Sequence, residues 1–209
     1  MSNPLVLFGT PVYSYDKYIG SSIHDISDVG EIGFLENTGK NLVSKHQNVL
    51  ELNNYKSIKY RILEGLEEYT RNILCVDDII EFYIVQSWIN INPPGTHHHR
   101  HWHPNSLISG VYYIDVDEEA NIAFISSSTD LSYGCVGYDL PRREFNIHNS
   151  LNWFYKVQSN QAIYFPSSLQ HEVLTNESTT DRISLSFNIL FKAQQEEMIY
   201  DNRKFNRPN

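Results

Sequence analysis

The sequence predicts a mainly β protein in which antiparallel strands form a two-sheet jelly roll, with one or two N-terminal supporting helices. The first observation is that the 14 Tyr, 10 Phe and 3 Trp residues gather in short runs between turn-forming residues, as they do in the strands of sandwiches and barrels. The second is that a succession of such runs fills the second half of the chain without a helical pattern between them. This order favours an antiparallel roll over a wound α/β sheet.

The helical support is predicted at residues 54–74, before the β-rich half. Apolar side chains recur there at steps of three and four residues, with Lys, Arg and Glu between them: Tyr55, Ile58, Ile62, Leu66, Tyr69 and Ile73. Packing of one helix face on a sheet accounts for this pattern completely. We therefore assign the helix no chemical role.

The strands are predicted in order along the rest of the chain. They span residues 82–95, 107–116, 120–127, 151–157, 161–166, 171–175 and 181–191, with an irregular region at 128–150. In the first of them the period of two places Trp88, Asn90 and Asn92 on one face, where they could support a site. The tail is expected to form a surface helix that frays into a mobile end.

Length and composition predict one globular domain. The chain has 209 residues, of which 41% are hydrophobic, which is enough to bury a single core. We expect an N-terminal strand and the helical support in residues 1–80, the core of the β-roll in 81–192 and the tail in 193–209.

Charge and cysteine content exclude several classes of protein. With 16 Lys and Arg against 25 Asp and Glu, the formal charge of −9 leaves no basic surface for nucleic acid. The sequence has neither a run of apolar residues that suits a membrane span nor a signal-peptide pattern, so a cytoplasmic protein is expected. Two cysteines, Cys75 and Cys135, are too few for a disulfide framework, and we expect both to be buried.

A cluster of histidines lies just before the second predicted strand. Five of the nine histidines fall in a single stretch: His97, His98, His99, His101 and His103. Residues two apart on a strand share a face, so His101 and His103 can direct two imidazoles at one metal ion while Trp102 faces away. The remaining histidines of the chain are expected to be surface or hydrogen-bonded residues.

A third ligand is predicted at His171. It follows an apolar strand and a Pro-Ser-Ser turn, and it opens the next strand. The separation from His103 is about the length of the strands that a roll must trace before it returns beside its starting strand.

An arginine is predicted inside the roll on the last strand. Alternation places Arg182, Ser184, Ser186 and Asn188 on one face and apolar residues on the other. A buried guanidinium is destabilising unless it meets an anion, and a carboxylate is its natural bidentate partner.

Three segments of the chain resemble a family of 2-oxoglutarate and Fe(II)-dependent oxygenases known mainly from phages and marine bacteria: HWHPNSLISGVYY, YFPSSLQHEVLTN and RISLSFN. The resemblance covers about residues 86–191, and the opening segment LFGTPVYSYD is also similar to the start of the family. It implies a double-stranded β-helix, distantly similar to prolyl hydroxylases, that binds Fe(II) and 2-oxoglutarate. It also implies a hydroxylase acting on a small-molecule or peptidyl substrate, located in the host cytoplasm if the chain is encoded by a phage.

The resemblance also implies roles for single residues. His101, His103 and His171 match the iron ligands, Arg182 matches the arginine that binds the distal carboxylate of 2-oxoglutarate, and Ser184 and Tyr113 assist it. His103 stands where most such oxygenases have an acid, which removes a negative charge from the iron site. Asn105 in the acid's place is an alternative, although it is a poor ligand.

Two other classes of function stay open on these residues. A three-histidine cupin would use the same roll and the same metal ligands as a dioxygenase or metal-binding module without 2-oxoglutarate. Arg182 discriminates between the two, because only the oxygenase gives this cation an anionic partner. A non-catalytic binding module that keeps the roll is the third class, and a homodimer is possible in each case.

Overall fold

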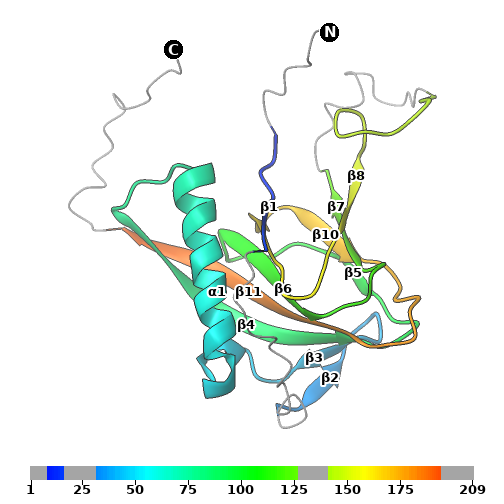
Figure 1. Ribbon diagram of the computed structural model, residues 1–209, viewed down its shortest axis with the longest axis horizontal. Helices are drawn as coiled ribbons and strands as arrows, with labels where there is room; N and C mark the ends of the chain where they lie inside the picture. The colour runs from blue at the N-terminus through cyan, green and yellow to red at the C-terminus, as the bar shows by residue number, and fades with distance from the viewer. Residues whose placement is uncertain (1–8, 17–31, 127–140, 194–209) are drawn as a thin grey trace.

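The computed structural model describes residues 9–16, 32–126 and 141–193, which form two antiparallel sheets with one α-helix against the larger sheet (Figure 1). The predicted mainly β roll is confirmed. No helix in these three segments is long and apolar enough to cross a membrane.

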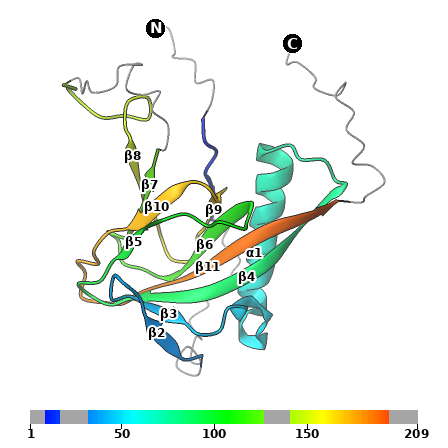
Figure 2. The ribbon, with the colours of Figure 1, turned by 180° about the vertical axis from the view of Figure 1, so that it is seen from behind.

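The larger sheet has seven strands in the order β1-β9-β6-β11-β4-β3-β2. Its strands are β1 (Tyr13–Tyr15), β2 (Phe34–Glu36), β3 (Leu42–Ser44), β4 (Ile80–Asn92), β6 (Ile108–Asp115), β9 (Ala162–Pro166) and β11 (Arg182–Ala193). The C-terminal strand β11 lies at the centre, between β4 and β6, and pairs with both. It therefore joins parts of the sheet that come from distant parts of the sequence (Figures 1 and 2).

The smaller sheet has four strands in the order β5-β10-β7-β8. Its strands are β5 (His98–His101), β7 (Asn121–Ile125), β8 (Asn152–Lys156) and β10 (Gln170–Val173). An apolar cluster joins it to the larger sheet, with Val111, Tyr113, Ile163 and Phe165 from one sheet and Ile122 and Phe124 from the other.

The helix α1 (Lys56–Glu67) continues into a π-helical turn, η4 (Glu68–Ile73), and follows two short 3-10 turns, η2 (Val49–Glu51) and η3 (Asn53–Tyr55). The prediction of a helix at 54–74 is thus confirmed. It packs on the outer face of the larger sheet through Ile58, Ile62 and Leu66, which share one buried cluster with Leu185 and Phe187 of β11.

The inner face of the larger sheet is polar. Alternate residues of β4 and β11 point away from the helix, and they are buried: Trp88, Asn90, Asn92, Arg182, Ser184, Ser186 and Asn188. Burial of so many polar side chains is unusual for a core and marks this face as the place of a site.

Several local predictions differ from the structure. Each predicted strand after residue 80 is present, with ends shifted by up to three residues. The described part of the N-terminal region contains three short strands, β1, β2 and β3, where one was predicted. A strand of three residues is too short for alternation to be visible in the sequence. Cys75 is exposed with a φ of 51°, so the expected burial is wrong for this cysteine. Cys135 and the tail from residue 194 lie outside the described residues.

Candidate active site

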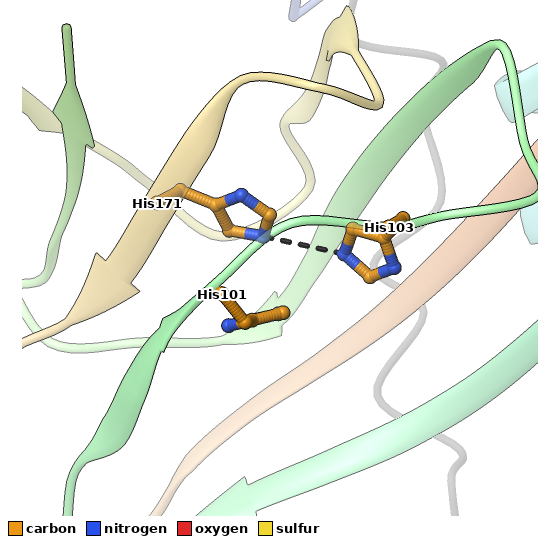
Figure 3. A group of neighbouring side chains, drawn as sticks. All are labelled: His101, His103 and His171. Atoms are coloured by element: carbon orange, nitrogen blue, oxygen red, sulfur yellow. Dashed lines mark hydrogen bonds between the residues drawn. The ribbon is translucent and has the colours of Figure 1, made fainter. Parts of the chain in front are cut away.

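Three histidines converge at one point between the sheets (Figure 3). His171 on β10 is paired directly with His101 at the end of β5. Each ring offers one nitrogen, and these three nitrogens all lie within 4.8 Å of one another. Nε2 of His103 is 3.3 Å from Nε2 of His171. His103 does not share a strand with His101 as predicted, because β5 ends at His101 and a turn at Pro104 and Asn105 follows.

The backbone fixes which nitrogen of two of these rings faces inward. Nδ1 of His101 lies 2.8 Å from the carbonyl oxygen of His99, and Nδ1 of His171 lies 3.0 Å from that of Leu169. Because a carbonyl only accepts, each Nδ1 carries the proton and donates it, and each Nε2 keeps a free lone pair. Two nitrogens at right angles on a metal, with bonds of about 2.1 Å, are separated by about 3 Å. The rings therefore fit one metal ion.

The three rings are uncharged at neutral pH. Burial lowers the pKa of His101, lowers that of His103 to about 4 and holds that of His171 well below its ordinary value, with neighbouring histidines adding to the effect in His103 and His171. A neutral imidazole binds a metal without first losing a proton.

Arg182 is buried on the inner face of the larger sheet, as predicted. Only 6% of the residue is exposed, Nη1 donates a hydrogen bond of 2.6 Å to the carbonyl oxygen of Asn121, and the guanidinium lies 5.3 Å from the ring centre of Tyr113. No carboxylate pairs with Arg182 in the described segments. A buried cation without a carboxylate is suited to an anionic ligand.

Three buried polar side chains beside Arg182 leave atoms unpaired. The Tyr113 hydroxyl, Asn90 Oδ1 and Asn92 Nδ2 make no regular hydrogen bond with any described residue. Ser184 lies between Asn90 and Tyr113 in the sheet, and Asn92 is paired with Arg182. Burial raises the pKa of Tyr113 to about 12, against the opposing effect of the Arg182 guanidinium, so its hydroxyl is a donor. Together with Arg182, the Tyr113 hydroxyl and Asn92 Nδ2 are donors that fit a carboxylate of 2-oxoglutarate, whereas Asn90 Oδ1 can only accept.

The remaining histidines of the cluster lie outside the group of three. His98 is half-buried and stacks on His101 with ring centres 4.5 Å apart, and burial lowers its pKa to about 3. Asn105, the alternative third ligand, is exposed in the turn that follows His103.

Two aromatic residues that the sequence did not single out continue the row of ligands across the smaller sheet. Phe124 on β7 is paired with His171, and Trp153 on β8 is paired with Phe124. Directly paired residues share a face, so both rings lie on the side of the metal ligands. Phe124 is buried 6.4 Å from the His171 ring, whereas Trp153 is 44% exposed. Pairing between strands this distant in sequence could not be predicted from alternation alone.

Residues 86–188 match the sequence profile of a protein family described as "Putative 2OG-Fe(II) oxygenase". This segment contains all three histidines, Tyr113, Arg182 and Ser184. No curated protein matches the sequence.

Solved structures of 2-oxoglutarate oxygenases have a similar fold. A prolyl-4-hydroxylase from Pseudomonas putida is 11% identical with a TM-score of 0.52, over 86% of this chain and 92% of that one. HygX from Streptomyces hygroscopicus, solved with nickel, 2-oxoglutarate and hygromycin B, is 10% identical with a TM-score of 0.56, over 86% of this chain and 82% of that one. The viral collagen prolyl hydroxylase of Paramecium bursaria Chlorella virus-1 is 11% identical with a TM-score of 0.53, over 85% of this chain and 94% of that one.

The profile match and the geometry of the three histidines agree with each other. The roll is that of the 2-oxoglutarate oxygenases, three neutral imidazoles converge inside it, and a donor-rich patch around a buried arginine lies on its inner face. The family match covers residues 86–188, and over this segment the chain is similar to the 2-oxoglutarate and Fe(II)-dependent oxygenases.

Proposed function

We propose that the protein couples the oxidative decarboxylation of 2-oxoglutarate to the hydroxylation of a C–H bond in a small-molecule or peptidyl substrate. The observation that carries this proposal is Arg182, a buried cation without a carboxylate partner in the described segments, on the inner face of the same roll as the three histidines. A cupin dioxygenase that does not use 2-oxoglutarate has no need of this cation.

His101, His103 and His171 would hold the iron through their imidazole nitrogens. Arg182, with Ser184 and Tyr113, would bind the distal carboxylate of 2-oxoglutarate. When bound, iron and 2-oxoglutarate supply the oxidation: 2-oxoglutarate, O₂ and R–H become succinate, CO₂ and R–OH. Three neutral ligands leave the Fe(II) charge uncompensated by the protein, and the dianionic co-substrate would balance it.

The protein's own residues orient these groups and limit the access of water. Trp88 on β4 packs beside His103, with the two ring centres 5.6 Å apart. Phe124 closes the site beside His171, and the half-exposed Trp153 continues the same face outward. We place the substrate on this open side, next to Thr96–Arg100. Residues 128–140 of the irregular region predicted at 128–150 lie outside the described residues.

Relatives of similar fold support both substrate classes. Two of them are named as prolyl hydroxylases, which act on peptidyl residues, and HygX was solved with the small molecule hygromycin B.

The test is an anaerobic titration with Fe(II) followed by 2-oxoglutarate. The wild-type protein should develop the visible charge-transfer band of the iron complex, and air should then release succinate slowly even without a substrate. His171→Ala should lose the band because it loses the metal, while His148→Ala, which replaces an exposed histidine, should keep it. Arg182→Ala should bind the metal as the wild type does but need at least about thirtyfold more 2-oxoglutarate, since about 2 kcal/mol of charged hydrogen bonding is lost.

Two outcomes would contradict the proposal. If the metal binds but 2-oxoglutarate neither changes the spectrum nor is consumed, the three-histidine cupin becomes the better assignment. If no metal binds to the wild type, the chain is a binding module that keeps only the roll.

A further inference from the structure

A cluster of buried hydroxyl groups joins the two segments that carry His103 and His171. Ser106 lies three residues after His103, Ser167 begins the turn that leads to His171, and Ser109 is on β6. The hydroxyl of Ser167 contacts those of Ser106 and Ser109, the latter at 2.8 Å. Ser109 and Ser167 are each 1% exposed.

The backbone of Ser167 is also bound to the loop of His103. The amide of His103 donates to the carbonyl oxygen of Ser167 at 2.9 Å, and the amide of Ser167 donates to that of Leu107 at 3.0 Å. On the other side, Leu169 in the same turn accepts from Nδ1 of His171. Ser167 therefore lies at the junction between the segment that carries His103 and the segment that carries His171. These two histidines are 68 residues apart in sequence.

The protons of this cluster have one consistent arrangement. Ser109 donates its only proton to Asn188 Oδ1 at 2.8 Å, so it can only accept from Ser167. Ser167 in turn can only accept from Ser106. Asn188 then donates to Gln86 at 3.2 Å. Ser167 and Ser109 thus each donate once and accept once, and Ser106 donates at the start of the chain, which ties both segments to the central strands β11 and β4.

We propose that the Ser106–Ser109–Ser167 cluster positions His103 relative to His171 and thereby sets the affinity of the site for its metal; this inference rests on the proposed function. His103 needs such support more than the other ligands do. It lies beyond the end of β5, so no strand pairing holds it, and no carbonyl oxygen of a described residue accepts from its Nδ1 as those of His99 and Leu169 do from His101 and His171. Removing one hydroxyl leaves its neighbour in the chain unpaired and loosens the loop of His103.

The test measures binding of Co(II) to the metal-free protein by its visible spectrum and by calorimetry. Ser167→Ala and Ser109→Ala should each weaken Co(II) binding about tenfold, as loss of groups that orient metal ligands generally does. The intensity of the d–d bands should change as well, because the angle between two ligands is no longer fixed. Ser106→Ala, at a half-buried position, serves as a variant with little risk to folding.

Ser87→Ala is the matched control. Ser87 is equally buried at 1% and accepts a hydrogen bond of 3.0 Å from the Leu50 amide, but it lies on the outer face of β4. It should lower the melting temperature of the metal-free protein without changing Co(II) affinity. Wild-type affinity in Ser167→Ala and Ser106→Ala would overturn the inference, as would an equal loss in Ser87→Ala. Failure of the wild type to bind Co(II) would instead overturn the proposed function.

Discussion

Tyr113 shows how a single residue can be unfavourable for folding and useful for function. Its side chain is 1% exposed, its ring packs against Arg182, whose side chain also interacts with the hydroxyl, and the hydroxyl proton has no acceptor among the described residues. A buried donor without an acceptor destabilises the folded state by about 1–3 kcal/mol. Such a group is kept where a ligand supplies the missing partner.

Tyr113→Phe should therefore have opposite effects on stability and on co-substrate binding. Without ligand, the variant should be more stable by about 1 kcal/mol, which raises the melting temperature by about 2–4 °C. The affinity for 2-oxoglutarate should fall about tenfold, since one hydrogen bond to a carboxylate is lost. Differential scanning fluorimetry with and without 2-oxoglutarate measures both effects. A lower melting temperature in the ligand-free variant would show that the hydroxyl has a structural partner.

The histidines that converge and the buried position of Arg182 could be predicted from sequence because their signals are local. His101 and His103 lie two residues apart, and Arg182 follows the alternation of its own strand. The serine cluster could not be predicted, since Ser106 and Ser167 are ordinary polar residues until the fold brings them together. The exposure of Cys75 follows from a left-handed turn that no composition rule indicates.

Among the secondary-structure elements, α1 depends on one close approach to the sheet. A Cβ added at Gly65 would lie 2.5 Å from the Tyr164 hydroxyl and 2.9 Å from Cγ of Tyr15. The Tyr164 hydroxyl donates a buried hydrogen bond of 2.7 Å to the carbonyl oxygen of Ile62. The helix thus approaches β9 closely because residue 65 has no side chain.

Gly65→Ala should destabilise the protein although alanine is the better helix former. The gain in helix propensity is about 1 kcal/mol, whereas the displaced Tyr164 loses its hydrogen bond and overpacks the core, at about 1–3 kcal/mol or more. Urea denaturation should show a net loss of about 1–2 kcal/mol. In the Tyr164→Phe background the same substitution should be less harmful, because the atom nearest to the new Cβ is gone. Equal effects in both backgrounds would contradict this account.

The elements with clear periodicity were predicted well. Both α1 and the long strands β4 and β11 repeat their pattern over many residues, so their faces and positions are correct, except that the π-helical turn leaves Ile73 50% exposed. The end of β5 was not predicted, because the turn at Pro104 and Asn105 overrides the alternation that placed His103 on a strand. The three histidines nevertheless converge as predicted, because a loop can position the third imidazole as well as a strand can.

The molecule as a whole should be sensitive to alkaline pH. Burial raises the pKa of Tyr69 and of Tyr113 to about 12 and that of Tyr164 well above its ordinary value. Above pH 10 the unfolded chain releases these protons while the folded chain keeps them, so stability falls as pH rises.

Each of these tyrosines should contribute up to about 1.4 kcal/mol of lost stability per pH unit between pH 10 and 12. Urea denaturation at pH 9, 10 and 11 measures the loss. Tyr69→Phe should make the decline shallower, because one fewer group titrates differently in the two states. Unchanged stability from pH 10 to pH 11 would contradict the burial of these hydroxyls.

The central place of β11 has a consequence for biosynthesis. Until this last described strand is made, the sheet consists of two halves, β1-β9-β6 and β4-β3-β2, which have no strand pairing with each other. Contacts between β11 and β4 span about 100 residues, and such long-range pairing is slow. A chain still on the ribosome therefore carries its three histidines in an incomplete roll, because the two halves of the larger sheet are joined only when β11 has been made.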